Sequence, residues 1–129
     1  MPNIFILLSH QFTEEQISDI NSELQISSII YMPENLYSLW SNIPPEPEKI
    51  HDILNPIRLW LKENAKSGDY ALIQGDMGAT YQMINYAFSI NMYPCYTTTE
   101  RISLQEKDDN GTVNLIKQFK HVRFRLYEK

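Results

Sequence analysis

The chain has 129 residues, of which 43% are hydrophobic and 21% are charged, and its formal net charge is -5. This length and balance predict a single globular domain over residues 1–129 and exclude a disordered chain. The net negative charge argues against a protein that binds long nucleic acid through a wide basic face. A small anionic nucleotide held in a local pocket is compatible with it.

Cysteine content and the N-terminal residues bear on the cellular compartment. Cys95 is the only cysteine, so an intrachain disulfide cannot form and a reducing compartment is the simplest expectation. The apolar run near the N-terminus follows no basic leader, and it is too short for a signal peptide or a membrane span. We therefore expect a cytoplasmic protein.

The first half of the chain predicts two strands and three helices. Residues 3–8 are continuously apolar, which is typical of a strand buried on both faces of a parallel sheet, and we expect this strand to be central. A capping box at Thr13 and Gln16 predicts a helix over residues 14–24, and residues 28–31 are predicted to form the second strand. A short helix over residues 34–40 should precede a proline-rich loop. Apolar residues from Ile50 to Leu61 mark one face of a long helix, which residues 67–69 should end.

The second half continues the alternation of strands and helices. An apolar strand ends at Gly75 and Gly78, a helix is expected over residues 81–90, and residues 93–98 are rich in β-forming side chains. This order predicts an open, mainly parallel α/β sheet with helices on both faces. The β-prone tail that follows should add antiparallel strands to one edge.

Three polar clusters follow predicted strands, and ligands bind beyond the carboxyl ends of strands in such sheets. The clusters are residues 9–11, residues 75–80 and residues 97–101. In the second cluster, two glycines at the mouth of a helix leave backbone N–H groups and the positive end of the helix dipole facing outward, which favours a phosphate. In the third, threonine hydroxyls followed by Arg101 suit a phosphodiester.

Each cluster also has a purely structural interpretation. Ser9 and His10 could serve only the loop that carries them, and the glycine segment lacks both a full dinucleotide fingerprint and a P-loop lysine. Asp76 is favoured as a helix cap over a catalytic group. Cys95 has no adjacent base, and the three histidines lack metal-ligand spacing with cysteine or acidic residues, so neither a thiol nucleophile nor a metal site is expected.

Five segments together carry a resemblance to a known family: residues 5–10 (FILLSH), 13–16 (TEEQ), 72–81 (LIQGDMGATY), 96–101 (YTTTER) and 119–127 (FKHVRFRLY). They resemble small type III CRISPR-associated proteins with a Rossmann-like fold related to CARF domains, and the resemblance spans almost the whole chain. It implies a ring nuclease, which binds a cyclic oligoadenylate messenger and cuts it, ending the signal that activates type III effectors.

The resemblance also implies a homodimer without a cofactor, with cyclic tetra-adenylate as the ligand and metal-independent cleavage. In that chemistry a ribose 2'-OH attacks the neighbouring phosphate and leaves a cyclic 2',3'-phosphate, which requires orientation and charge stabilisation. A twofold-symmetric ring also fits across a twofold dimer axis. We expect Ser9, His10 and Arg101 to be catalytic. The expected ligand-binding residues are Gln11, Gln74, Gly75, Asp76, Gly78, Ala79, Thr80, Thr97, Thr98 and Thr99.

Two other functions stay open at this point. The first is a non-catalytic module that sequesters the same messenger, and the second is a small toxin-like or regulatory Rossmann protein that binds another nucleotide. Turnover separates cleavage from sequestration, because a sequestering protein releases its ring intact after denaturation.

Overall fold

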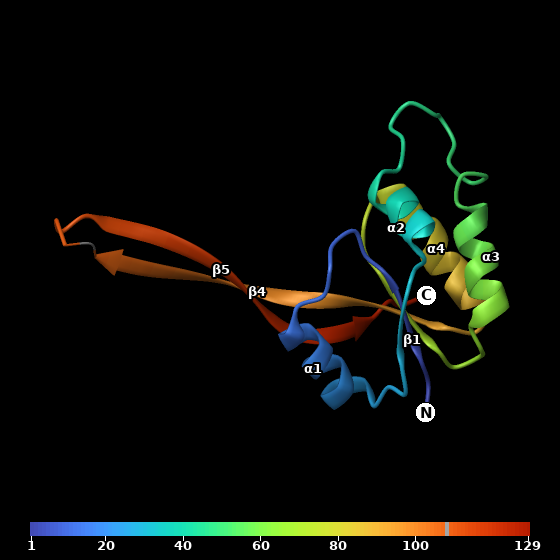
Figure 1. Cartoon of the computed structure of the whole chain (residues 1–129), viewed down its shortest axis with the longest axis horizontal. Helices are drawn as coiled ribbons and strands as arrows, with labels where there is room; N and C mark the ends of the chain where they lie inside the picture. Colours follow the sequence, from blue (N-terminus) through green and yellow to red (C-terminus); the bar gives the residue numbers. More distant parts are fainter. Residues whose placement is uncertain (108) are drawn as a thin grey trace.

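The computed structural model of the chain describes residues 1–107 and 109–129, which form one sheet flanked by helices (Figure 1). The strands are β1 (Ile4–Leu7), β2 (Ile29–Tyr31), β3 (Tyr70–Ile73), β4 (Tyr93–Lys107) and β5 (Val113–Leu126). The helices are α1 (Glu14–Leu24), α2 (Glu34–Ser41), α3 (Asn55–Asn64) and α4 (Met77–Ser89). Within the described part of the chain, none of these helices is long and apolar enough to cross a membrane.

The sheet has the strand order β2-β1-β3-β4-β5. Strands β1 to β4 pair in parallel and β5 pairs antiparallel with β4, so the expected mainly parallel α/β sheet with an antiparallel tail is confirmed. The expectation that residues 3–8 form the central strand is wrong, because β1 lies second in the order and β3 lies at the centre. The reason is that the C-terminal hairpin extends the sheet beyond β3.

The two faces of the sheet carry separate apolar cores. Successive side chains of a strand point to opposite faces, so Phe5 joins the core formed with α2, α3 and α4, whereas Ile6 joins the core formed with α1. Trp40 of α2 is the largest fully buried side chain of the first core, and Ile20 of α1 anchors the second. Burial on both faces explains why β1 is continuously apolar.

Helix starts follow local capping chemistry. The capping box of α1 is confirmed, since the Thr13 hydroxyl accepts from Gln16 N–H at 3.1 Å and the Gln16 side chain accepts from Thr13 N–H at 3.0 Å. Helix α3 begins at Asn55, later than expected, because the preceding residues form turns. Helix α4 begins at Met77, earlier than expected, because Asp76 caps it.

The C-terminal hairpin is a long twisted ribbon that projects from the body of the molecule (Figure 1). The expectation that a strand ends at Thr98 is wrong, because β4 continues to Lys107 and pairs with β5 along its length. Residues 97–101 therefore lie inside a strand and not in a loop after it. A bulge leaves Val122 as an extra residue of β5 opposite Thr98 and Thr99, and bulges increase local twist.

The two glycines between β3 and α4 differ in what surrounds them. Trp40 Nε1 donates to the Gln74 carbonyl at 3.0 Å, and a Cβ added to Gly75 would lie 2.8 Å from that nitrogen. A Cβ added to Gly78 would lie 3.5 Å from Ile50 Cδ1, which is ordinary van der Waals contact. Packing inside the chain therefore requires glycine at position 75 and not at position 78.

We predict that Gly75→Ala lowers the free energy of unfolding by about 1–3 kcal/mol, because Trp40 is fully packed and cannot yield to the added methyl group. Gly78→Ala is the matched control and should change that free energy by less than about 1 kcal/mol. Chemical denaturation of both variants and the wild type provides the measurement. Equal stability of Gly75→Ala and the wild type would contradict this account of the glycine.

Cys95 lies on β4 in the α1-side core and has no exposed surface. Burial raises the pKa of its thiol from 9.0 to about 12, because the charged thiolate is poorly solvated there. The reactive thiolate is therefore scarce at neutral pH, which agrees with the expectation that Cys95 is not a nucleophile.

We predict that Cys95 reacts with a thiol reagent at neutral pH only after unfolding. The same pKa shift means that the unfolded chain releases the thiol proton first as pH rises, so stability should fall between about pH 9 and about pH 12. Labelling kinetics with and without denaturant, and denaturation midpoints across that pH range, test both statements. Rapid labelling of the native protein would contradict them.

Candidate functional site

The carboxyl ends of β1 and β3 form the centre of the candidate site. From β1 the chain moves to β2 on one side and then crosses back to β3 on the other, so the sheet has a topological switch point between β1 and β3. Leu7 pairs with Ile73, and Gln74 N–H donates to the Leu7 carbonyl at 3.0 Å. Two of the predicted clusters, residues 9–11 and residues 75–80, therefore leave the sheet side by side.

Gln74 joins the third predicted cluster to this edge. Its side-chain oxygen accepts from Thr97 N–H at 3.2 Å and from the Thr97 hydroxyl at 2.9 Å. The Thr98 hydroxyl bonds to the backbone of Arg123 on β5, donating at 3.1 Å and accepting at 3.2 Å. The hydroxyls of Thr97 and Thr98 thus already have hydrogen-bond partners in the chain. To bind a ligand as expected, they would have to exchange these bonds for bonds to the ligand.

The structure does not bring Arg101 to the same edge of its own chain. Thr99 and Arg101 are exposed residues of β4 that pair with His121 and Phe119 of β5. At about 3.3 Å per residue, Arg101 lies roughly 13 Å beyond Thr97 along the strand. The strand carries it outward on the projecting ribbon (Figure 1).

The start of α4, where the sequence predicts an anion, is formed by Asp76, Met77 and Gly78. The Asp76 side chain accepts from Ala79 N–H at 3.0 Å, so its role as a helix cap is confirmed. Ala79 is fully buried and its N–H is already engaged, whereas Met77 and Gly78 are exposed residues. The Thr80 hydroxyl oxygen is buried and has no hydrogen-bond partner among the described residues.

A cavity of about 430 Å³ lies beside residues 9–11, at the carboxyl ends of β1 and β2. Its apolar floor comes from Ile6 and Leu8, and this volume lies within the range of small-molecule sites. Its remaining wall includes His10, Gln11, Phe12, Tyr31, Glu34 and Tyr37. A shallower cavity of about 350 Å³ lies around Gln74, Gly75 and Thr80, next to the exposed side chains of Met77 and Tyr81.

The loop that carries Ser9 and His10 is bonded to helix α2. The Tyr37 hydroxyl donates to the Ser9 carbonyl at 3.2 Å, and His10 Nδ1 lies 3.3 Å from the Gln11 carbonyl oxygen. Ser9 and His10 are both exposed. His10 lines the larger cavity, where it could contact a ligand, and Ser9 immediately precedes it in the same loop.

Sequence reasoning missed the aromatic and acidic residues of this cavity. Phe12, Tyr31 and Tyr37 come from a loop, a strand and a helix that are separated along the chain, and Glu34 opens α2. The available signal was the position of Tyr31, which ends β2 at the same edge of the sheet as residues 9–11. The helical residues gave no comparable signal, because their orientation depends on how α2 packs.

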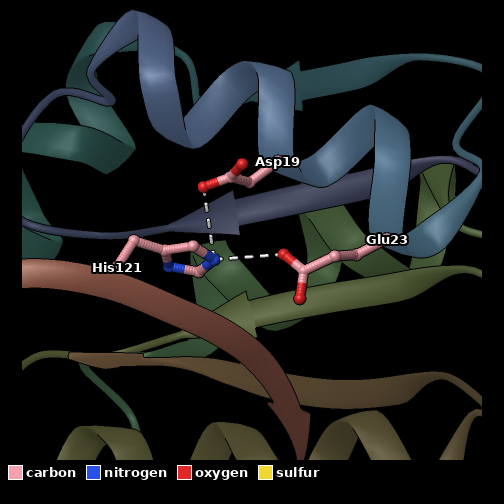
Figure 2. A group of neighbouring side chains, drawn as sticks. All are labelled: Asp19, Glu23 and His121. Carbon is pink, nitrogen blue, oxygen red and sulfur yellow. Dashed lines mark hydrogen bonds and ion pairs between the residues drawn. The ribbon is translucent and has the colours of Figure 1, made fainter. Parts of the chain in front are cut away.

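Sequence reasoning also missed a second cluster, which lies between α1 and β5 (Figure 2). His121 Nε2 is 3.0 Å from Glu23 Oε2 and 3.6 Å from Asp19 Oδ2. The histidines do lack metal-ligand spacing in sequence, but the fold places this one beside two carboxylates that are about a hundred residues earlier in the chain. The sequence did show that Asp19 and Glu23 are spaced by one helical turn, which places both carboxylates on one face of a helix.

Comparison with known proteins places the chain in a family. The family model described as "Uncharacterized protein MJ1673 family" matches residues 2–125. A relative from Methanocaldococcus jannaschii, described as "Uncharacterized protein MJ1673", is 47% identical over 127 residues, which cover 98% of each chain. No solved structure matches the chain. The match extends over the sheet, the helices and the ribbon, and the chain therefore belongs to the MJ1673 family.

Proposed function

We propose that this protein is a ring nuclease that binds cyclic tetra-adenylate, cuts it without a metal ion and so ends type III CRISPR signalling. The observation that carries the proposal is that three features lie at the carboxyl edge of the sheet: the exposed loop with His10, the N-terminus of α4 with Gly78, and the aromatic-lined cavity. The five family-like sequence segments support the choice of a cyclic oligoadenylate over other nucleotides.

The larger cavity suits an adenine base. Phe12, Tyr31 and Tyr37 offer aromatic rings, and the flat face of a base can stack on such rings. The Glu34 carboxylate can accept a hydrogen bond from the exocyclic amine of adenine, and the Gln11 amide can both donate and accept. A cavity of about 430 Å³ is large enough for one nucleoside of the ring.

The start of α4 suits the phosphate between two nucleosides. Its first amides and the helix dipole favour an anion, and Gly78 permits close approach of a phosphate because packing inside the chain does not require a glycine there. The Asp76 carboxylate is held by Ala79 N–H, which keeps this negative charge in its capping position. The phosphate and the base would then lie on either side of residues 9–11.

His10 is the group best placed to take the proton of the attacking 2'-OH. As the cyclic 2',3'-phosphate forms, the bond from phosphorus to the 5'-oxygen of the next nucleoside breaks, and the proton taken up by His10 can be returned to that leaving oxygen. His10 is exposed at the cavity mouth, and imidazole is the side chain most suited to proton transfer near neutral pH. The adjacent Ser9 hydroxyl can orient the ribose, since Tyr37 fixes the backbone that carries it. Orientation and proton transfer are the two needs of an internal nucleophile.

A homodimer would supply the missing positive charge. Neither cavity of this edge has a lysine or arginine among the described residues that line it, although the ligand is an anion. Arg101 lies on the projecting ribbon, so a twofold partner could bring its Arg101 to the phosphate held at α4 of this chain. A guanidinium can form paired hydrogen bonds to phosphate oxygens and stabilise the transition state.

Cleavage should occur in excess EDTA, because the proposed mechanism uses an internal nucleophile, a base and an arginine. The purified chain is incubated with cyclic tri-, tetra- and hexa-adenylate, and the products are chromatographed after denaturation. Linear products that end in a cyclic 2',3'-phosphate, formed fastest from cyclic tetra-adenylate, are expected. Intact rings after tight binding would establish sequestration, activity restored only by a divalent ion would refute the metal-free mechanism, and absence of binding would refute the function.

Mixing two inactive variants tests where Arg101 acts. His10→Ala and Arg101→Ala should each slow cleavage by about 100-fold or more, because each removes a group that acts in the transition state. If Arg101 serves the partner's site, random mixed dimers should recover about a quarter of the wild-type rate, because half of the dimers are mixed and each has one intact site.

The control for this experiment is His51→Ala, which alters an exposed histidine on the α3 side of the molecule and should leave the rate unchanged. Binding of the ring, measured separately, should survive His10→Ala. Wild-type rates in either single variant would remove that residue from the mechanism, and failure to recover activity on mixing would place Arg101 in its own chain's site.

A further inference from the structure

The cluster of Asp19, Glu23 and His121 is built by two features of the fold (Figure 2). Asp19 and Glu23 lie one turn apart on α1 and point toward the same strand, β5. On β5 the bulge at Val122 changes the alternation of side chains, so that His121 and Phe124 both face α1 while Val122 is exposed. Without that extra residue His121 would face the opposite side of the ribbon.

The histidine is buried although its acidic neighbours are not fully so. The His121 side chain exposes 5% of its surface, compared with 32% for Asp19 and 31% for Glu23. Its Nδ1 atom is buried and has no hydrogen-bond partner within the described residues. The other ring nitrogen, Nε2, faces the two carboxylates, so a group bound between them would contact that atom.

A divalent cation could be held between Nε2 and the two carboxylates. A neutral imidazole would bind it through Nε2 and carry its own proton on Nδ1, and the cation would offset the two carboxylate charges beside it. The cluster contains one ligand atom from each residue, and these three atoms all lie within 4.8 Å of one another. Imidazole and carboxylate are both common ligands of Zn²⁺.

The distances within the cluster agree with such a site. Zinc bonds of about 2.1 Å place two ligands about 3.0 Å apart at a right angle and about 3.4 Å apart at the tetrahedral angle. The observed separations from Nε2 are 3.0 Å to Glu23 and 3.6 Å to Asp19, so small rotations would suffice. The other oxygen of Glu23 accepts from Phe124 N–H at 3.2 Å, and such outer contacts orient metal-binding carboxylates.

We propose that Asp19, Glu23 and His121 form a divalent transition-metal site of the zinc type, with water completing the coordination. The ion joins α1 to β5 at the base of the ribbon and so holds the ribbon in one orientation. This role is structural and independent of the proposed ring cleavage, because the ligands lie on the body of α1 and not at the carboxyl edge of β1 and β3.

Titration of the untagged protein with Zn²⁺, followed by calorimetry, tests the site. We expect one ion per chain, and we expect the double variant Asp19→Asn/Glu23→Gln to bind it at least about 100-fold more weakly, because both anionic ligands are removed. Asp52→Asn is the matched control, since it makes the same chemical change beside the exposed His51. Its affinity should equal that of the wild type.

Thermal unfolding provides a second readout. Zinc at about 100 times its Kd should raise the Tm of the wild type and of Asp52→Asn by about 5–15 °C and should leave the double variant unchanged. The absence of saturable binding, or equal binding by all three proteins, would overturn the proposal. So would a lower Tm of the double variant combined with no effect of zinc on the wild type, because that result describes a metal-free ion pair.

The wild-type chain alone gives a test that does not depend on a variant folding. The imidazole nitrogen resonances of His121 should shift on addition of zinc and return on addition of EDTA, because the ion binds Nε2. Unchanged His121 resonances at saturating zinc would also overturn the proposal.

Discussion

The parallel pairing of β1 with β3 is the constraint on which the candidate site depends. Because Leu7 pairs with Ile73, the histidine loop and the start of α4 leave the sheet as neighbours. A slip of one residue would turn every side chain of β1 to the other face and so into the wrong one of the two cores. The apolar cores therefore enforce the register, and the register positions the polar residues.

Gln74 and Trp40 make this edge rigid. The Gln74 carbonyl accepts from the Trp40 indole, and the Gln74 side chain accepts from Thr97, so one residue ties α2, β3 and β4 together. Gly75 allows the indole to approach the chain at this point. A proposed site of this kind gains from rigidity, because catalysis by orientation loses its advantage when the reacting groups move apart.

The ribbon needs support from the rest of the chain, since a two-stranded hairpin is only marginally stable by itself in water. Its base is secured to α1 by Phe124 in the core, by the bond from Phe124 N–H to Glu23 and by His121. The two proposals concern different parts of the ribbon. The proposed metal ion would lie at its base between α1 and β5, whereas Arg101 lies on β4 and would act at a partner's site without needing that ion.

Local patterns in the sequence determined the elements of this protein, including the capping box at Thr13, the cap at Asp76, the buried strand of residues 4–7 and the antiparallel tail. They also determined which clusters follow β1 and β3, because these depend on chain order alone. The length of β4 was missed, since a strand continues where a partner strand supplies hydrogen bonds. Only the tertiary structure decided that α2 adds Tyr37 to the cavity and that His121 meets Asp19 and Glu23, because helix packing and a bulge bring together residues that no sequence spacing connects.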